Sequence, residues 1–429
     1  MAIGRDQRLW WEESPSDEAY GREINILFRK IVPNIPSTTM GVFGIYRYPA
    51  KFIPQVVAYI LERYGDPGMW VLDPFAGSGT TGLVARLYRV HYELWDLNPL
   101  LEVIHRVAML DPQSIRPEQI ARQMMSSSWI WLPQWRNLDY WYSDEVLHLL
   151  GKLWGYFHSL EEGSLKWLIV VPLLKISQIF SYNDLQRQKL SRSPRAFRRV
   201  ANLMKGDWRK RMQDILVEEI YKIMSKIREY RAMLGNAVDE VQAVLRVGRD
   251  TLALSQDPPG EWDLLVTSPP YLQAQEYIRC IKLDLFWLGY TEEQIRALAR
   301  LELPYRDVSP ITVCSETFHR IRSEIEESRL VRLFDRYFHG VLGALTALST
   351  RIRYRMFIFV GPASIRGRSI PIHQIITEHF REHGWHHEMT LVDRIVARTM
   401  FRATVNPATG LSDHRVAAEY MVILSRRRM

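Results

Sequence analysis

The residues with the clearest chemical potential lie in one stretch, DLLVTSPPY at Asp263–Tyr271. The apolar run Leu264–Thr267 predicts a short buried strand. Pro269 and Pro270 stop this strand, because proline lacks an N–H group and restricts the residue before it. The turn then presents the Ser268 hydroxyl, carbonyls without local N–H partners and the Tyr271 ring. Such groups suit hydrogen-bond acceptance and ring stacking at the carboxyl end of a strand, where open α/β sheets bind ligands.

A second chemical stretch precedes it by almost two hundred residues. Its pattern predicts a strand at Trp70–Leu72, a glycine-rich loop at Asp73–Gly79, a helix at Thr80–Tyr88 and a strand at Tyr92–Trp95 that ends in Asp96. Glycines let a backbone approach a ligand, and the helix N-terminus favours an anionic group. An acid at the end of the second strand is placed to bind ribose hydroxyls. Dinucleotide binding is one rival, although the spacing FxGSG differs from GxGxxG.

These loops need a framework of alternating strands and helices. A helix is predicted over Ile53–Leu61, with Gly65 in a C-cap position. Residues 290–335 are charged and helical, which suggests a lid or a second insertion. Further strands are predicted at Val244–Val247, Arg355–Val360, Thr390–Val392 and Glu419–Leu424, and further helices at Ile281–Leu288 and Ile370–His383.

Composition bounds the class of protein. A chain of 429 residues is long enough for a large core, and its 47% hydrophobic and 24% charged residues are ordinary for a globular protein. Two cysteines, Cys280 and Cys314, exclude a disulfide framework. The N-terminus lacks the apolar run of a signal peptide, and the most apolar window, Trp167–Leu174, is shorter than a membrane span. We therefore expect a soluble, cytoplasmic protein without membrane contact.

The net charge of +8 is concentrated in one segment. Between Arg187 and Arg211 there are ten Lys and Arg residues and one acid, Asp207, which makes a local charge of +9 and leaves −1 for the rest. Ser191, Ser193, Phe197 and Trp208 interleave with these cations, as suits phosphate and base contacts. The alternative is a solvated surface loop. The predicted DNA-binding residues are Arg187, Lys189, Arg192, Arg195, Arg198, Arg199, Arg209, Lys210 and Arg211.

Together the motifs resemble those of a known family. DPFAGSGTT at Asp73–Thr81 is similar to the S-adenosylmethionine motif of DNA amino-methyltransferases, and TSPPY at Thr267–Tyr271 to their catalytic motif. YPAKF at Tyr48–Phe52 resembles the segment that precedes the cofactor motif in the same enzymes. The resemblance implies an α/β, Rossmann-like, seven-stranded methyltransferase sheet with a large helical insertion, and S-adenosylmethionine as cofactor. By the same resemblance the cofactor-binding residues are Lys51, Phe52, Asp73, Phe75, Gly77, Gly79, Thr80, Thr81, Asp96 and Asp250.

The implied domains are an arm at 1–40, a catalytic domain at 41–110 and 244–429, and a basic helical insertion at 111–243 that serves target recognition. The insertion falls before Asp250, which departs from the usual arrangement of the family and leaves its recognition role open. Purely structural roles also remain open for two of these residues: Asp96 as a turn acid and Asp250 as a helix N-cap. The implied partner is double-stranded DNA, with a restriction endonuclease as functional partner, and the chain is expected to be a monomer or homodimer.

The resemblance assigns catalysis to Ser268, Pro269, Pro270 and Tyr271. The serine oxygen and the Pro269 carbonyl would accept hydrogen bonds from both N–H groups of a base amine, and Tyr271 would stack on the extruded base. Ser268 resembles the cytosine-N4 branch more than the adenine-N6 branch, so we expect N4-cytosine methylation, with N6-adenine as the alternative. Neither cysteine follows a proline, which disfavours carbon-5 cytosine methylation.

Two other functions remain as alternatives: an RNA amino-methyltransferase, and a nucleic-acid-binding protein that has lost its activity. The candidate metal ligands are His379, His383, His386 and His387, of which the first two are spaced i, i+4. No third ligand type is expected in a suitable place beside them, so no metal is predicted.

Overall fold

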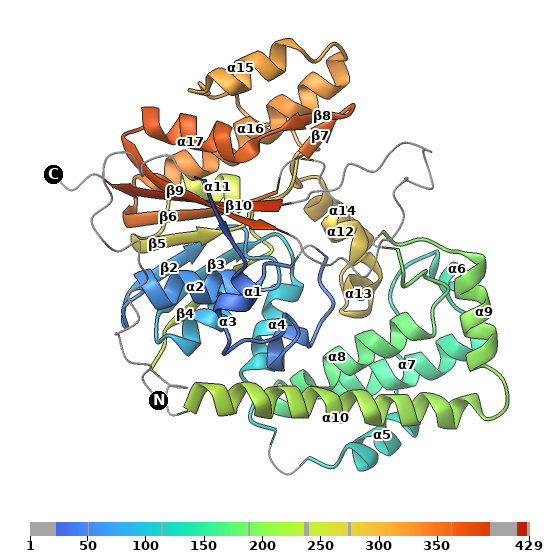
Figure 1. Cartoon of the computed structure of the whole chain (residues 1–429). Coiled ribbons are helices and arrows are strands. Elements are labelled where there is room, and N and C mark those ends of the chain that lie inside the picture. The colour runs from blue at the N-terminus through green and yellow to red at the C-terminus, as the bar shows by residue number, and fades with distance from the viewer. Residues whose placement is uncertain are drawn as a thin grey trace. The chain divides into compact units, whose positions relative to one another are not determined.

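The computed structural model describes residues 23–49, 51–112, 115–187, 189–235, 240–272, 276–361, 363–394 and 418–426 (Figure 1). The chain divides into two compact units. Unit 1 comprises residues 1–31, 252–273 and 307–429, and unit 2 comprises residues 32–251 and 274–306. Within the described residues, none of the helices is long and apolar enough to cross a membrane.

Unit 2 holds three parallel strands, in the order β2-β3-β4. They are β2 (Trp70–Asp73), β3 (His91–Asp96) and β4 (Ala243–Val247). The middle strand, β3, is apolar on both faces, with Tyr92, Leu94 and Trp95 fully buried, as expected for a strand inside a parallel sheet. The helices before and between the first strands are α2 (Pro54–Tyr64), α3 (Thr80–Leu87) and α4 (Leu100–Ala108), preceded by the 3-10 helix η2 (Gly41–Gly44).

The described part of the predicted insertion is helical. Helix α10 is the longest, and it packs along α8 and α5 and also contacts α3 and α4 (Figure 1). Its buried side chains recur at helical spacing, from Met212 through Leu216 and Ile220 to Ile223. The six helices are α5 (Pro117–Met125), α6 (Leu138–Trp141), α7 (Asp144–Ser159), α8 (Ser164–Ile179), α9 (Pro194–Leu203) and α10 (Trp208–Leu234). After the catalytic stretch, unit 2 adds α12 (Tyr277–Cys280), α13 (Lys282–Trp287) and α14 (Glu292–Ala299).

Unit 1 holds five strands in the order β1-β9-β10-β6-β5. β5 runs parallel to β6, and β10 runs antiparallel to both β6 and β9. The strands are β1 (Glu23–Ile26), β5 (Trp262–Thr267), β6 (Ile352–Val360), β9 (Trp385–Arg394) and β10 (Ala418–Arg426), with a ribbon of β7 (Ala363–Ile365) and β8 (Arg368–Ile370). The helices are α1 (Phe28–Ile31), α15 (Glu316–Ser323), α16 (Ser328–Ser349) and α17 (Ile372–Glu382), and α11 (Thr251–Gln256) begins where the units meet in sequence.

All seven predicted strands are present, and the α/β, Rossmann-like class with a helical insertion is confirmed. One expectation was wrong in detail. Residues 23–26, which were interpreted as part of a peripheral arm, form β1 and pair in parallel with β9. A four-residue strand shows too little alternation to be recognised from sequence. The proposed domain boundaries stay predictions, because the two compact units follow a different division of the chain.

Candidate active site

The glycine loop between β2 and α3 is held in a conformation that favours glycine. Gly77 and Gly79 have φ angles of +55° and +78°, which L side chains rarely adopt. A Cβ at Gly77 would lie 3.1 Å from the Tyr48 ring, and one at Gly79 would lie 2.8 Å from Leu101 Cδ1. Both glycines are therefore required by the local backbone and packing, and Gly79 starts α3 against the core.

Asp73 organises the loop from within. Its Oδ1 accepts a hydrogen bond from the Phe75 N–H at 3.2 Å, and its Oδ2 accepts one from the Thr81 hydroxyl at 2.5 Å. Asp73, Thr80 and Thr81 are all buried. The Thr81 hydroxyl donates to the carboxylate, so it shapes the loop rather than offering that hydrogen to a ligand.

Asp96 ties the same loop to the end of β3. Its Oδ2 accepts from the Gly77 N–H and its Oδ1 from the Asn98 N–H, each at 2.7 Å. Burial raises the pKa of Asp96 to about 6, against the opposing effect of these two N–H groups. The side chain keeps part of its surface exposed. A carboxylate so placed can still accept hydrogen bonds from ligand hydroxyls.

Three residues that the sequence did not single out lie beside this loop. Tyr48 and Tyr277 stack, with ring centroids 6.3 Å apart and planes 8° from parallel. Glu302 is buried and accepts a hydrogen bond from the Ile278 N–H at 2.9 Å. Burial, together with the nearby charges of Glu276 and Asp96, raises the pKa of Glu302 to about 7. Tyr48 stands in the YPAKF motif, whereas no pattern in the sequence marks Glu302.

The remaining predicted cofactor residues have protein partners. The Lys51 ammonium donates to the Phe43 carbonyl, and burial lowers its pKa to about 8. Phe52 is buried. Asp250 pairs with Arg306 at 2.6 Å, and the adjacent Thr251 hydroxyl donates to the Pro74 carbonyl at 2.5 Å. The end of β4 is therefore tied to the glycine loop, and Arg306 is a second charged residue that the sequence did not indicate.

The predicted catalytic turn belongs to unit 1. All six residues of β5 are buried, and the chain leaves this strand at Ser268. Pro269 is buried, whereas Ser268 and Pro270 are half-buried. The Tyr271 hydroxyl donates to Glu419 Oε1 on β10 at 2.9 Å, which fixes one end of the half-buried ring. The turn therefore presents two half-buried residues, Ser268 and Pro270, and a half-buried ring that is anchored at its hydroxyl.

The basic segment divides into two groups of side chains. Arg199 donates to the carbonyls of Ile179 and Asn183 at 3.1 and 2.9 Å and to that of Ser181, and burial lowers its pKa. Arg211 donates to the Lys205 carbonyl at 2.8 Å and to the Leu203 carbonyl. These two cations support the local fold, so they are poor probes of DNA contact.

The other cations of the segment lie closer to solvent. Arg187, Lys189 and Lys210 pair with Asp184, Glu276 and Asp214, at 3.6, 2.7 and 2.7 Å. Arg195 is exposed and donates to Gln186. Arg198 and Arg209 are exposed, and Arg209 lies over the Trp208 ring. Arg192 lies over three aromatic rings.

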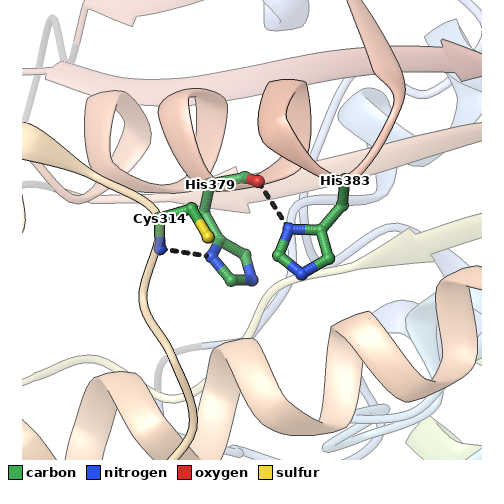
Figure 2. A group of neighbouring side chains, drawn as sticks. All are labelled: Cys314, His379 and His383. Atoms are coloured by element: carbon green, nitrogen blue, oxygen red, sulfur yellow. Dashed lines mark hydrogen bonds between the residues drawn. The ribbon is translucent and has the colours of Figure 1, made fainter.

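A cluster of Cys314, His379 and His383 offers three ligand atoms within 4.8 Å of one another (Figure 2). The expectation that no third ligand type lies nearby was therefore wrong. However, His379 Nδ1 accepts the Cys314 N–H at 3.2 Å, so its proton is on Nε2, which donates to the Thr346 hydroxyl at 2.9 Å. Burial lowers the pKa of His379 to about 4, in keeping with this neutral ring. A metal would have to displace one of these bonds, and the absence of a metal stays a prediction.

Known proteins share parts of this chain. A DNA methylase family, N6_N4_Mtase, matches residues 9–99. The Type II methyltransferase M.BsoBI of Geobacillus stearothermophilus is 23% identical over 344 residues, which cover 71% of this chain and 64% of that protein. The chain therefore spans just under two thirds of that relative's length. M.MvaI of Kocuria varians is 21% identical over 417 residues, covering 88% of this chain and 89% of that protein.

Two solved structures of the rRNA methyltransferase aviRa from Streptomyces viridochromogenes align over 89% of this chain and 88% of theirs, at 11% and 12% identity. Their TM-score of 0.28 is too low to support an argument about fold or substrate.

The parallel strands β2, β3 and β4 and the glycine loop closed by Asp96 give the chain an α/β framework of the kind that binds ribose-bearing cofactors at the carboxyl ends of its strands. The family match and the two long alignments confirm the narrower resemblance: the chain is related to the DNA amino-methyltransferases. This relationship implies S-adenosylmethionine as the methyl donor.

Proposed function

We propose that this protein transfers a methyl group to the exocyclic amine of a base in double-stranded DNA, with cytosine N4 as the preferred atom. The observation that carries the proposal is the Ser268–Tyr271 turn at the end of the fully buried strand β5. The glycine loop closed by Asp96 supports it, because the same chain then has a fitting site for the methyl donor.

The residues of the loop suit S-adenosylmethionine, which supplies a methyl group on a positively charged sulfonium. The half-buried Asp96 carboxylate would accept hydrogen bonds from the ribose hydroxyls, while it keeps the Gly77 N–H in place. Tyr48 and Tyr277 would border this site and limit the access of water. Above about pH 7 the buried Glu302 would add negative charge near Asp96, which favours a cationic ligand.

The catalytic turn would prepare the amine for attack. An exocyclic amine is a weak nucleophile, because its lone pair is delocalised into the ring. The Ser268 hydroxyl oxygen and the Pro269 carbonyl would accept hydrogen bonds from its two N–H groups. These bonds make the nitrogen more tetrahedral and orient its lone pair. This is catalysis by positioning and electrostatics. Tyr271, fixed through Glu419, would stack on the extruded base.

Serine at position 268 favours cytosine N4 over adenine N6 by the resemblance to the N4 branch. N6-adenine methylation is the second candidate, because both amines present the same two hydrogens to the turn. RNA is the third candidate substrate, since a base flipped from RNA would offer the same amine.

The proposal is tested by incubating the protein and labelled S-adenosylmethionine with plasmid DNA and, in a parallel reaction, with RNA, followed by nucleoside analysis of both. N4-methylcytosine is the expected product. N6-methyladenine would replace the base assignment, and label found only in RNA would overturn the DNA substrate.

Variants at Tyr271 test the mechanism in the same assay. Tyr271→Ala is expected to lower turnover by about a hundredfold while cofactor affinity is kept, because stacking is lost and the glycine loop is untouched. Tyr271→Phe is the matched control: it keeps the ring and removes the hydroxyl that donates to Glu419, so turnover should fall by about threefold. Equal losses in turnover and cofactor affinity would contradict a stacking role.

A further inference from the structure

The Arg192 side chain lies among three aromatic rings on the basic segment. Its guanidinium carbon is 4.0 Å from the centroid of the Tyr140 ring, 4.4 Å from that of Phe197 and 5.2 Å from that of Tyr182. Tyr182 and Phe197 are themselves stacked, with centroids 4.6 Å apart. We call Arg192, Tyr140, Phe197 and Tyr182 the aromatic clamp. Its members come from α6, the loop after α8 and α9, so one cation joins three parts of the insertion.

The guanidinium has unmet hydrogen-bonding capacity. Arg192 Nε is buried without a hydrogen-bond partner. Nor does any other group among the described residues accept a hydrogen bond from this guanidinium, which carries five N–H donors. By contrast, the donors of Arg199 on the same segment are used by three backbone carbonyls. The buried Nε is a donor that is costly to leave without an acceptor. The terminal N–H groups, which are not among the buried unpartnered atoms, can bind a ligand that reaches the clamp.

The surface of the clamp suits a nucleic acid. Tyr140 is 52% exposed and Phe197 is 39% exposed, so apolar ring surface reaches solvent. Arg195 and Arg198 on the same helix as Phe197 are exposed and supply positive charge beside it. Aromatic surface with flanking cations is the arrangement that stacks bases and follows a phosphate backbone.

We propose that the aromatic clamp binds a base of the DNA substrate: Tyr140 and Phe197 contact the ring of the base, and the N–H donors of Arg192 bind the acceptors on its edge. This inference rests on the proposed function, since it assumes DNA as the substrate. Planar N–H pairs match the O6 and N7 acceptors of guanine, so guanine is the favoured base. The clamp would then contribute to sequence preference, whereas Arg195 and Arg198 contact phosphates without reading sequence.

Arg192→Lys separates a base contact from a phosphate contact. Lysine keeps the charge but loses the planar donor fork. The full chain is titrated with a labelled duplex cut from the plasmid that it methylates, over a series of salt concentrations. We expect Arg192→Lys to bind about tenfold more weakly at an unchanged salt slope. Arg198→Gln should instead reduce the slope by about 0.9, the value for one phosphate contact. Wild-type affinity in Arg192→Lys would overturn the inference.

Two exposed-ring variants guard against a merely structural role for Arg192. Tyr140→Ala and Phe197→Ala should each weaken DNA binding by about tenfold. The melting temperature should fall by only about 2–4 °C, because one ring contact is lost, and cofactor affinity should be unchanged. Tyr354→Ala is the matched control, because Tyr354 is 49% exposed on β6 in the other unit. Unchanged binding in both clamp variants would overturn the inference even if Arg192→Lys fails to fold. The inference would also be overturned if the wild-type protein bound an RNA of the same sequence more tightly than the DNA duplex.

The outcomes distinguish this inference from the proposed function. If the wild-type protein methylates DNA and the clamp variants bind DNA equally well, the clamp inference is wrong and the proposed function is kept. If the wild-type protein neither binds nor methylates DNA, both the proposed function and the clamp inference are wrong.

Discussion

The glycine loop and the basic segment both carry many polar groups, but the protein uses those groups differently. In the loop, Asp73 and Asp96 accept hydrogen bonds from N–H and hydroxyl groups of the loop, of the start of α3 and of the turn after β3. In the basic segment, Arg199 is held by backbone carbonyls, whereas Arg198, the residue before it, is exposed. Residues in the loop act together, and residues in the basic segment have separate roles. A charge count over the segment therefore overstates the number of cations that can contact DNA.

Arg199→Ala should give the largest change in stability. The substitution removes a half-buried cation and leaves the carbonyls of Ile179, Ser181 and Asn183 without its donors. We expect a loss of about 3–5 kcal/mol in the free energy of unfolding, measured by denaturant titration. Arg198→Ala, at the adjacent exposed position, is the control and should change stability by less than about 0.5 kcal/mol. Equal effects would mean that the two arginines have the same role.

Glu302→Gln should give the next largest change, and a pH-dependent one. The native pKa of Glu302, about 7, lies above the ordinary value of 4.5 because of burial. Its proton therefore stabilises the native state fully below about pH 4.5, and this stabilisation is lost as the pH rises to about 7. Glutamine has no such titration, so the variant should become more stable than the wild type by up to about 3 kcal/mol at pH 8.

Melting temperatures of both proteins between pH 4.5 and 8 measure this difference. Glu218→Gln on the exposed face of α10 is the control and should follow the wild type at every pH. If Glu302 also favours the cationic cofactor, Glu302→Gln should bind S-adenosylmethionine more weakly at pH 8 while it is more stable. Parallel melting curves for the variant and wild type would contradict the raised pKa.

The strands and the glycine loop could be predicted because their signals are local. The run Leu264–Thr267, or a run such as Tyr92–Trp95, indicates a buried strand without knowledge of the rest of the chain. Glu302, Arg306 and Tyr277 could not be predicted, since their relation to the loop depends on how distant segments fold back. The same limit applies to Cys314, which lies 65 residues before His379 and meets it only in the folded chain.

Thr81→Val should have the smallest of these effects, and it tests whether the loop is closed from within. Valine keeps the shape of threonine but removes the hydroxyl that donates to the buried Asp73 carboxylate at 2.5 Å. We expect a loss of about 2 kcal/mol in the free energy of unfolding, because a hydrogen bond to a charged group is removed. Thr80→Val is the matched control: its hydroxyl meets only Ser78 Oγ at 3.3 Å, so the expected loss is about 0.5 kcal/mol. Cofactor affinity, measured under conditions in which the variant is fully folded, distinguishes a role in shaping the loop from a role in binding the ligand. If Thr81 shapes the loop, its substitution should lower both the stability and the cofactor affinity. A Thr81→Val protein with wild-type stability and much weaker cofactor binding would show that the hydroxyl serves the ligand, and that the loop is less self-contained than its hydrogen bonds indicate.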